Sequence, residues 1–319
     1  MYSVGVARGE KSYDAVRQAL TLIRDQVTIP PDRPVLIKPN MVEPDRPLCA
    51  TPVEAVYAVL EFLAGFGVER FIIAEGTALE QGETMRAFRD YGYFSLQDKF
   101  DVEFRNLYDD DKVVLEALNA HLEPVDIRLA KSLFHSTVVS VARMKTHRQV
   151  IATLSLKNIG IGAIHNPDRH SPPWHTIDPT QFSHLARPLN LSLARLALAL
   201  PIHLAVIDGV VGMEGEGPVK GTPISSGVAL AGTDALAVDL LGAELMGLDP
   251  RTIGHFWYLS QLRGLSRAQI EARGADLAQC VTRFELPSTF PAILGWHVPE
   301  WQRYLCGQYL KQGTMDAVH

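Results

Sequence analysis

Short apolar runs alternate with longer stretches of helical periodicity in the first part of the chain. The runs at Ser3–Ala7, Val35–Ile37 and Phe71–Ala74 have the length of buried strands. Between them, residues 13–27 and 52–66 repeat apolar positions at the spacing of a helix that buries one face. This alternation is typical of parallel strands joined by crossover helices.

The middle of the chain follows a less regular pattern. Residues 114–129 predict antiparallel strands, and Ser136–Met144 predicts a strand that ends just before Lys145. Residues 148–159 carry apolar side chains at helical spacing, and a strand is the alternative. His165–Pro188 is rich in proline and histidine, which predicts a long loop of the kind that is functional or mobile.

Helices and strands alternate again after this loop. Leu189–Leu200 predicts a helix, and His203–Ile207 predicts a strand that ends at Asp208 and Gly209. A glycine-rich loop is expected over residues 212–221, before a strand at Val228–Ala231 and a helix over residues 234–246. Like Asp208, Glu75 follows an apolar strand and precedes a glycine, and ligands of open α/β sheets bind beyond such strand ends.

These elements predict an α/β fold, with a mainly parallel sheet covered by helices, a smaller mixed α/β region and a long loop rich in His and Pro. We expect residues 1–265 to form the α/β core. This core could be a single unit or two lobes that meet near residues 130–150. Residues 266–319 would form an α-rich C-terminal extension with one strand, at Cys280–Phe284.

Composition and charge narrow the class of protein. The 319 residues include 30 Lys and Arg against 36 Asp and Glu, a formal charge of −6, so we expect no nucleic-acid partner. The most apolar stretch, Leu196–Ile207, is too short to span a bilayer, and the N-terminus does not resemble a secretory signal. We therefore expect a cytoplasmic protein with no membrane partner. The sequence leaves open whether the chain forms a homo-oligomer.

The three cysteines, Cys49, Cys280 and Cys306, are far apart and form no C-x-x-C pair. They are too few for a four-thiolate cluster, and their spacing does not suggest a disulfide framework. We therefore expect no iron–sulfur cluster in this chain.

Three lysines are each followed by a polar partner within two residues. They are Lys38 with Asn40, Lys145 with His147, and Lys157 with Asn158. Lysine supplies a positive charge and asparagine supplies both donors and an acceptor, a combination that suits a carboxylate or a phosphate. The alternative is that these are ordinary solvated lysines, an alternative that is weaker for Lys157 because its neighbours are apolar.

The segment VIDGVVGMEGEGPVKG, residues 206–221, combines glycines with acids. Gly209, Gly215 and Gly217 would let the backbone approach a ligand closely. Their spacing is not that of a dinucleotide fingerprint. Asp208 and Glu214 could bind Mg²⁺, serve as a general base or pair with the lysines. The alternative is a surface turn with solvated glutamates.

His165 and His170 lie five residues apart in the predicted long loop. A metal site needs three or four converging ligands, and a spacing of five does not place histidines on one helix face. We therefore interpret this loop as a polar lid that covers an active site. A metal site at His165 and His170 is the alternative.

Several short motifs, taken in this order, resemble the domain-of-unknown-function 362 family. They are IKPN (37–40), MKTH (144–147), SLKN (155–158), IDGVVGMEGEGPVKG (207–221) and GTDALAVD (232–239). The resemblance implies that the lysines, asparagines and acids named above occupy the family's motif positions, but it does not assign them an activity. Some members carry an appended ferredoxin-like segment with clustered cysteines. This chain lacks that segment, so the resemblance implies no iron–sulfur role here.

Our interpretation is an enzyme that acts on a small anionic metabolite by acid–base chemistry, of the isomerase, lyase or transferase type rather than a nicotinamide-dependent oxidoreductase. The candidate catalytic residues are Lys145, His147, Lys157, Asp208 and Glu214. The candidate ligand-binding residues are Lys38, Asn40, Asn158, Gly209, Gly215 and Gly217. The alternatives are a redox or metal-cofactor accessory protein that works with a separate ferredoxin, and a non-catalytic protein that binds a small ligand.

The parallel sheet also predicts where the charged candidates lie. Parallel strands present their carboxyl ends at one edge of a sheet. We therefore expect six side chains that are distant in sequence to converge on one cleft. They are Lys38, Lys145, His147, Lys157, Asp208 and Glu214.

Overall fold

The computed structural model describes residues 1–78, 83–165, 168 and 178–306. A ten-stranded sheet runs through this part of the chain, in the order β12-β1-β11-β9-β7-β2-β3-β4, with β10 beside β9 and β8 beside β7. A separate antiparallel pair, β5 and β6, confirms the strands expected over residues 114–129. The strands are β1 (Tyr2–Arg8), β2 (Val35–Pro39), β3 (Arg70–Glu75), β4 (Asp101–Asn106), β5 (Lys112–Leu118), β6 (Pro124–Ala130), β7 (Thr137–His147), β8 (Ile151–Thr153), β9 (Leu204–Glu214), β10 (Thr222–Ile224), β11 (Val228–Gly232) and β12 (Ile270–Gly274).

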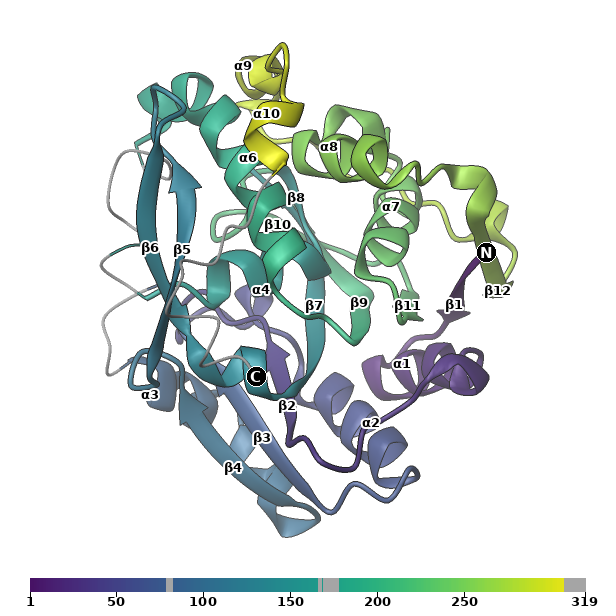
Figure 1. Ribbon diagram of the computed structural model, residues 1–319. Coiled ribbons are helices and arrows are strands. Elements are labelled where there is room, and N and C mark those ends of the chain that lie inside the picture. The colour runs from purple at the N-terminus through teal and green to yellow at the C-terminus, as the bar shows by residue number, and fades with distance from the viewer. Residues whose placement is uncertain (79–82, 166–167, 169–177, 307–319) are drawn as a thin grey trace.

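The expected α/β architecture, a mainly parallel sheet covered by helices, is confirmed. Along the main order only the pairings of β11, with β1 and with β9, are antiparallel, and the other five are parallel. Helices cover both faces of the sheet (Figure 1). They are α1 (Ser12–Thr21), α2 (Val53–Ala64), α3 (Glu83–Asp90), α4 (Ser155–Gly162), α6 (Phe182–Ala199), α7 (Ala235–Leu245), α8 (Gly254–Arg263), α9 (Phe290–Ile293) and α10 (Gln302–Leu305).

The two faces of the sheet are built from alternate residues of each strand. Ile37 of β2 and Val139 of β7 pack with α1 and α2 in one apolar cluster. Their neighbours Leu36 and Val138 pack on the opposite face with α4, α6 and the β5–β6 pair. This alternation is what the pleat of a strand requires, and both faces of a parallel sheet are buried.

Two predicted segments outside the core motifs are wrong. The loop expected to reach Pro188 gives way to α6, which begins at Phe182 and contains Pro188. Phe182, Leu185 and Leu189 recur at helical spacing and are buried, so packing outweighs the backbone hydrogen bond that proline cannot donate. In the extension, the strand is β12 rather than Cys280–Phe284, because Ile270–Gly274 pairs in parallel with β1.

The motif-bearing segments also differ from the prediction. Residues 148–159 form strand β8 followed by the start of α4, rather than one helix. Both β7 and β9 run several residues further than expected, to His147 and Glu214. The extra length is stabilised because β8 pairs with the end of β7 and β10 pairs with the end of β9. Asp208 and Lys145 therefore lie within strands rather than at their exits.

Candidate functional site

Lys38 lies near the carboxyl end of β2, and its ammonium is wholly buried. It forms an ion pair with Glu75 at the end of the neighbouring strand β3. It also donates to Asn158 Oδ1 at 3.1 Å and to the Pro39 carbonyl at 3.0 Å. The counter-charge and the two acceptors compensate the loss of water around the buried cation. Lys38 is therefore fixed in one position.

Asn158 ties helix α4 to the strands beneath it. Its amide nitrogen donates to the Lys38 carbonyl and to Ser140 Oγ, at 3.1 Å each, while its oxygen accepts from Lys38 Nζ. Gly162 brings the other end of α4 equally close, because a Cβ added there would lie 2.3 Å from Lys38 Nζ. Two predicted residues, Lys38 and Asn158, are thus in direct contact.

Asp239 of α7 fixes the start of α4. Its two carboxyl oxygens accept from the Ser155 and Leu156 amides, both at 2.8 Å. Complete burial raises the pKa of Asp239 to about 8, although both N–H bonds and the helix N-terminus favour the ionised form. The sequence interpretation noticed Asp239 within a motif but gave it no role. Its role comes from contacts with residues more than eighty positions away.

Lys145 forms a second centre in the extended part of β7. Its Nζ donates to Asn40 Oδ1 and to the Cys49 carbonyl, the latter at 2.9 Å. Burial lowers the pKa of Lys145 to about 7, because the charged form loses its water, and the Lys38 charge acts in the same direction. Burial also raises the pKa of the Cys49 thiol. Lys145 is thus a buried amine that loses its proton near neutral pH.

The Lys145 partners are held in place from two sides. The Asn40 amide donates to Thr51 Oγ1 at 2.9 Å, and the Thr51 hydroxyl donates to the Val141 carbonyl at 2.7 Å. These bonds connect the segment between β2 and α2 to the middle of β7. The charges of Lys38 and Glu75 both act on Lys145, so the two lysine centres are neighbours near the ends of adjacent parallel strands.

Asp208 packs toward helix α1. Its carboxylate accepts from Ser12 Oγ at 2.8 Å and from the Val210 amide at 3.0 Å. Burial raises its pKa, while the Arg143 charge opposes that shift. Arg143 is the residue opposite Asp208 in the β7–β9 register. Asp208 therefore has a structural setting between the sheet and α1.

The glycine-rich segment is tied to its own chain. Glu214 accepts from the Glu285 amide at 2.8 Å, and the Gly215 amide donates to the Glu285 carbonyl at 2.9 Å. Gly215 has a φ of +71°, which favours glycine. At Gly217 a Cβ would lie 2.1 Å from the Thr146 carbonyl, so only glycine fits beside β7.

Gly209 and His147 also contact neighbouring residues of the same chain. A Cβ at Gly209 would lie 2.9 Å from Met144 Sδ. The Gln149 amide donates to His147 Nδ1 at 3.1 Å, and both residues are buried. Ligand binding by Gly209, Gly215 and Gly217 stays a prediction, as does a catalytic role for His147.

The six expected side chains do not form one network of the hydrogen bonds described above. Among the described residues, direct bonds join two predicted pairs, Lys38 with Asn158 and Lys145 with Asn40. Asp208 and Glu214 instead bond to Ser12 and Glu285. A common cleft for all six stays a prediction.

The charge of Lys157 in α4 acts on His255 of α8, a residue that the sequence did not single out. Both are buried, with 0% and 7% of their surfaces exposed. Burial and then the Lys157 charge lower the pKa of His255, to about 3. An isolated histidine in an apolar, aromatic segment gave no signal in the sequence.

The metal site proposed for the histidine-rich loop is untested. His165 packs edge-on to Tyr108 with ring centroids 6.2 Å apart, and burial lowers its pKa. His170 lies outside the described residues. Within the described ranges, no group of three or more His, Cys, Asp or Glu side chains is arranged to hold a metal ion.

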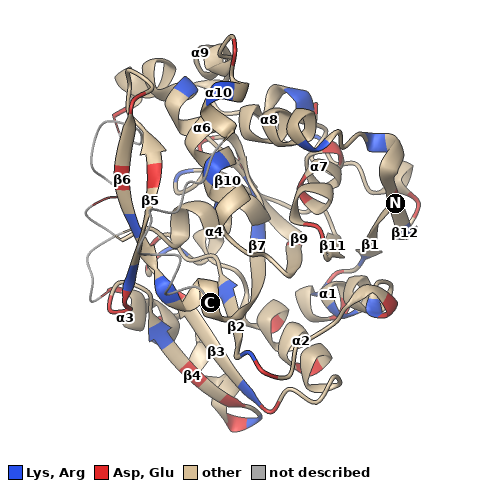
Figure 2. Cartoon of the chain, viewed as in Figure 1, with Lys and Arg blue, Asp and Glu red and all other residues tan. Residues whose placement is uncertain are grey.

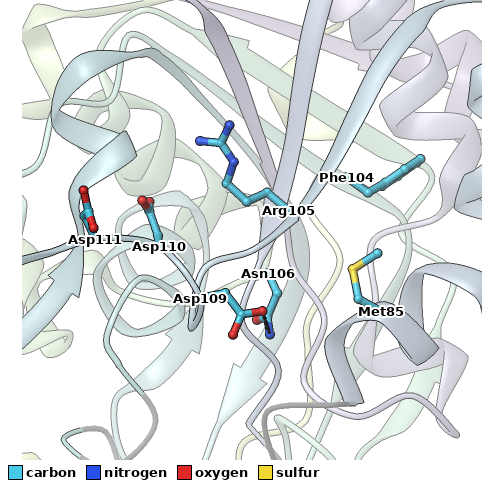
Figure 3. A pocket seen from close by; sticks show the side chains of 7 residues that line it. All are labelled: Met85, Phe104, Arg105, Asn106, Asp109, Asp110 and Asp111. Carbon is cyan, nitrogen blue, oxygen red and sulfur yellow. Dashed lines mark hydrogen bonds between the residues drawn. The ribbon is translucent and has the colours of Figure 1, made fainter.

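A separate surface cavity of about 480 Å³ lies beside the end of β4 (Figure 3). It is lined by Met85, Phe104, Arg105, Asn106, Asp109, Asp110 and Asp111. Two of its acids already accept hydrogen bonds, Asp109 from Asn106 and Asp110 from the Ser132 amide, both at 3.0 Å. None of the predicted site residues lines it, so we place the candidate site at the buried lysines.

Comparison with known proteins assigns the chain to a family. The chain belongs to the family described as Domain of unknown function (DUF362), whose model matches residues 35–244. It is 29% identical over 233 residues to the thylakoid-associated protein sll1697 of Synechocystis sp. (strain ATCC 27184 / PCC 6803 / Kazusa). That match covers 70% of this chain and 66% of the relative.

Two solved structures match this chain in part. The lactate racemase apoprotein of Thermoanaerobacterium thermosaccharolyticum matches with a TM-score of 0.47 and 12% identity, over 76% of this chain and 56% of that one. A Thermotoga maritima protein matches with a TM-score of 0.38 and 13% identity, over 79% of this chain and 59% of that one.

Two further features concern the charged residues and the apolarity of the helices. Positive and negative residues are interspersed over the elements (Figure 2). In the part of the chain that the structure describes, no helix has both the length and the apolarity needed to cross a bilayer.

Proposed function

We propose that the protein is an enzyme that binds a small anionic metabolite, a carboxylate or a phosphate, near the ends of β2 and β7 and acts on it by acid–base chemistry. One observation carries this proposal: Lys145 is a wholly buried amine whose pKa is about 7. A group with a pKa near the working pH is suited to proton transfer.

The hydrogen bonds of Lys145 are consistent with a base. A neutral amine has two N–H donors and one lone pair. The two acceptors around Lys145, Asn40 Oδ1 and the Cys49 carbonyl, match the two donors. The lone pair is then left to take a proton, while the Lys157 charge attracts the anion.

The proposal leads to a direct experiment. Purified protein is incubated with a metabolite extract, and mass spectrometry records which anions are retained on the protein and which change in amount. Lys145→Met should abolish the change in amount, whereas Lys99→Met, at an exposed position, should not. Anions that are retained but never converted would indicate a binding protein. If no anion is retained or converted, the proposal is wrong.

Several sequence predictions remain untested and complete the proposal. We keep a cytoplasmic location, Mg²⁺ as the candidate cofactor and no iron–sulfur cluster in this chain as predictions, and homo-oligomerisation stays open. The name of the Synechocystis relative associates that protein with thylakoids. Fractionation of cells that express this chain would show whether it is found with membranes or in the cytoplasm.

A further inference from the structure

His255 has a fixed tautomer. The Asn190 amide nitrogen donates to the Ala186 carbonyl at 2.9 Å, which fixes the orientation of that amide. Asn190 Oδ1 then accepts from the His255 backbone amide at 3.0 Å and lies 3.1 Å from His255 Nδ1. Because this oxygen can only accept, Nδ1 carries the ring proton. The other ring nitrogen, Nε2, therefore presents a bare lone pair.

That lone pair is buried and has no hydrogen-bond partner among the described residues. Native proteins leave few buried polar atoms unsatisfied, so each one requires an explanation. His255 is also packed tightly: a Cβ at the preceding Gly254 would lie 2.7 Å from the Asn190 side chain. The ring is thus held with one nitrogen satisfied by the protein and the other available.

The charge near this lone pair is positive. Lys157 is close enough to lower the pKa of His255, an effect that adds to burial, so His255 is neutral at physiological pH. A cation attracts an anionic group, and a neutral imidazole nitrogen accepts a hydrogen bond. A ligand that carries a hydrogen-bond donor close to its anionic group can interact with both the Lys157 cation and the imidazole nitrogen.

We propose that Lys157 and His255 Nε2 together bind an anion that carries a hydroxyl or N–H group close to its carboxylate or phosphate. Lys157 pairs with the anionic group, and His255 accepts the hydrogen bond from the donor. This inference rests on the proposed function, because it specifies the class of metabolite that the site selects.

Matched pairs of anions test the selection. The probes are glycolate with acetate, malate with succinate, and glycerol 3-phosphate with propyl phosphate. The wild-type protein should bind at least one donor-bearing member about tenfold more tightly than its partner, the contribution of one hydrogen bond. His255→Phe should abolish the preference and retain binding of the donor-free anion. His121→Phe, at an exposed position, is the control, and Lys157→Met should weaken both members.

A second measurement uses the wild-type chain, so it does not depend on a folded variant. In protein labelled with ¹⁵N-histidine, the His255 Nε2 resonance should have the shift of an unprotonated nitrogen. The donor-bearing anion should move it upfield, and the donor-free anion should not.

The possible failures are distinguishable. If the paired anions bind equally and His255→Phe changes neither affinity, or if the resonance does not move, the inference is wrong and the proposed function stands. If the Nε2 resonance already has the shift of a hydrogen-bonded nitrogen in the absence of any anion, an ordered water donates to the lone pair. That result would also overturn the inference. If the wild-type protein binds none of the six probes but retains an anion from the metabolite extract, the inference is wrong and the proposed function stands. If it also retains and converts no anion from the extract, both proposals fail.

Discussion

Lys38 of β2 and Glu75 of β3 form an ion pair whose side chains are 0% and 2% exposed. Each residue ends an apolar run at the same edge of the sheet. Among the ion pairs of the residues that the structure describes, this one has both side chains removed from water, and its charges act on the amine of Lys145. Its energetics can be measured without knowledge of any ligand.

Removal of one partner of the Lys38–Glu75 pair should be far more damaging than removal of both. Lys38→Met or Glu75→Gln leaves a buried group without its counterpart, and we expect each to lower the free energy of unfolding by about 3–5 kcal/mol. The double variant should lose much less unfolding free energy than the sum of the two single losses. Urea unfolding of the four proteins measures this coupling. Additive losses would show that the two groups do not interact.

Gly162→Ala should destabilise the protein, because the new methyl group would lie 2.3 Å from Lys38 Nζ. Lys38 cannot move away without breaking its bonds to Glu75 and Asn158. We expect a loss of about 1–3 kcal/mol in the free energy of unfolding.

Gly160 in the same helix provides the control for Gly162. Its nearest neighbour to an added Cβ is Leu193 Cδ2, at 3.4 Å. Gly160→Ala should therefore be neutral or should stabilise the helix by up to about 1 kcal/mol. Equal effects of the two substitutions in thermal or urea unfolding would argue against close packing of α4 on Lys38.

Asp239→Asn should weaken anion binding as well as stability. An amide nitrogen would face one of the two α4 amides from which the Asp239 carboxyl oxygens now accept, and the resulting mismatch should cost about 1–3 kcal/mol of unfolding free energy. The start of α4 would shift, and Lys157 and Asn158 with it.

Asp234→Asn provides the matched control for Asp239→Asn. Asp234 accepts from Ala237 at the start of α7, and asparagine is an equally good residue at such a position. The substitution also removes the ion pair of Asp234 with Arg263, so we expect a loss of up to about 1 kcal/mol in stability and no change in anion retention. Normal anion binding by Asp239→Asn would show that Asp239 does not position the site.

The stability of the protein should depend on pH through Lys145. Its pKa is about 7 in the folded chain and 10.5 in the unfolded reference, so the unfolded state binds more protons between these values. The free energy of unfolding that Lys145 contributes therefore rises from pH 7 toward pH 10. Below pH 7 the penalty of the buried charge is constant.

Comparison with Lys145→Met isolates this contribution. The advantage of the methionine variant in unfolding free energy should be largest at pH 7 and below and should shrink as the pH rises. A difference that does not change between pH 7 and pH 10 would show that Lys145 titrates normally.

Local pattern was sufficient to predict most of the sheet and the position of its lysines. Lys38 follows an apolar run of strand length, and it lies at the end of a strand in the fold. Lys145 was expected at a strand exit, but β7 continues past it because β8 folds back and pairs with it. Such pairing depends on a turn at residues 148–150 that periodicity does not reveal.

The partners of the lysines could not be predicted, because they arise from long-range contacts. Glu75 was visible as an acid at a strand end, but nothing in the sequence links it to Lys38 rather than to solvent. Asp239 and His255 lie in segments whose apolar character predicts only burial, and Cys49 lies in the connection before α2. Their chemical surroundings depend on how α2, α7 and α8 pack on the sheet.

The position of β1 in the sheet has a consequence for synthesis on the ribosome. β1 precedes both of its neighbours in the chain and lies between β11 and β12, with Val4 opposite Gly232 on one side and Ala272 on the other. Neither neighbour exists until most of the chain has been translated. The apolar residues of β1 must therefore stay unpaired while the segments between β1 and β11 are translated. Completion of this part of the sheet is a late event that requires β11 and β12.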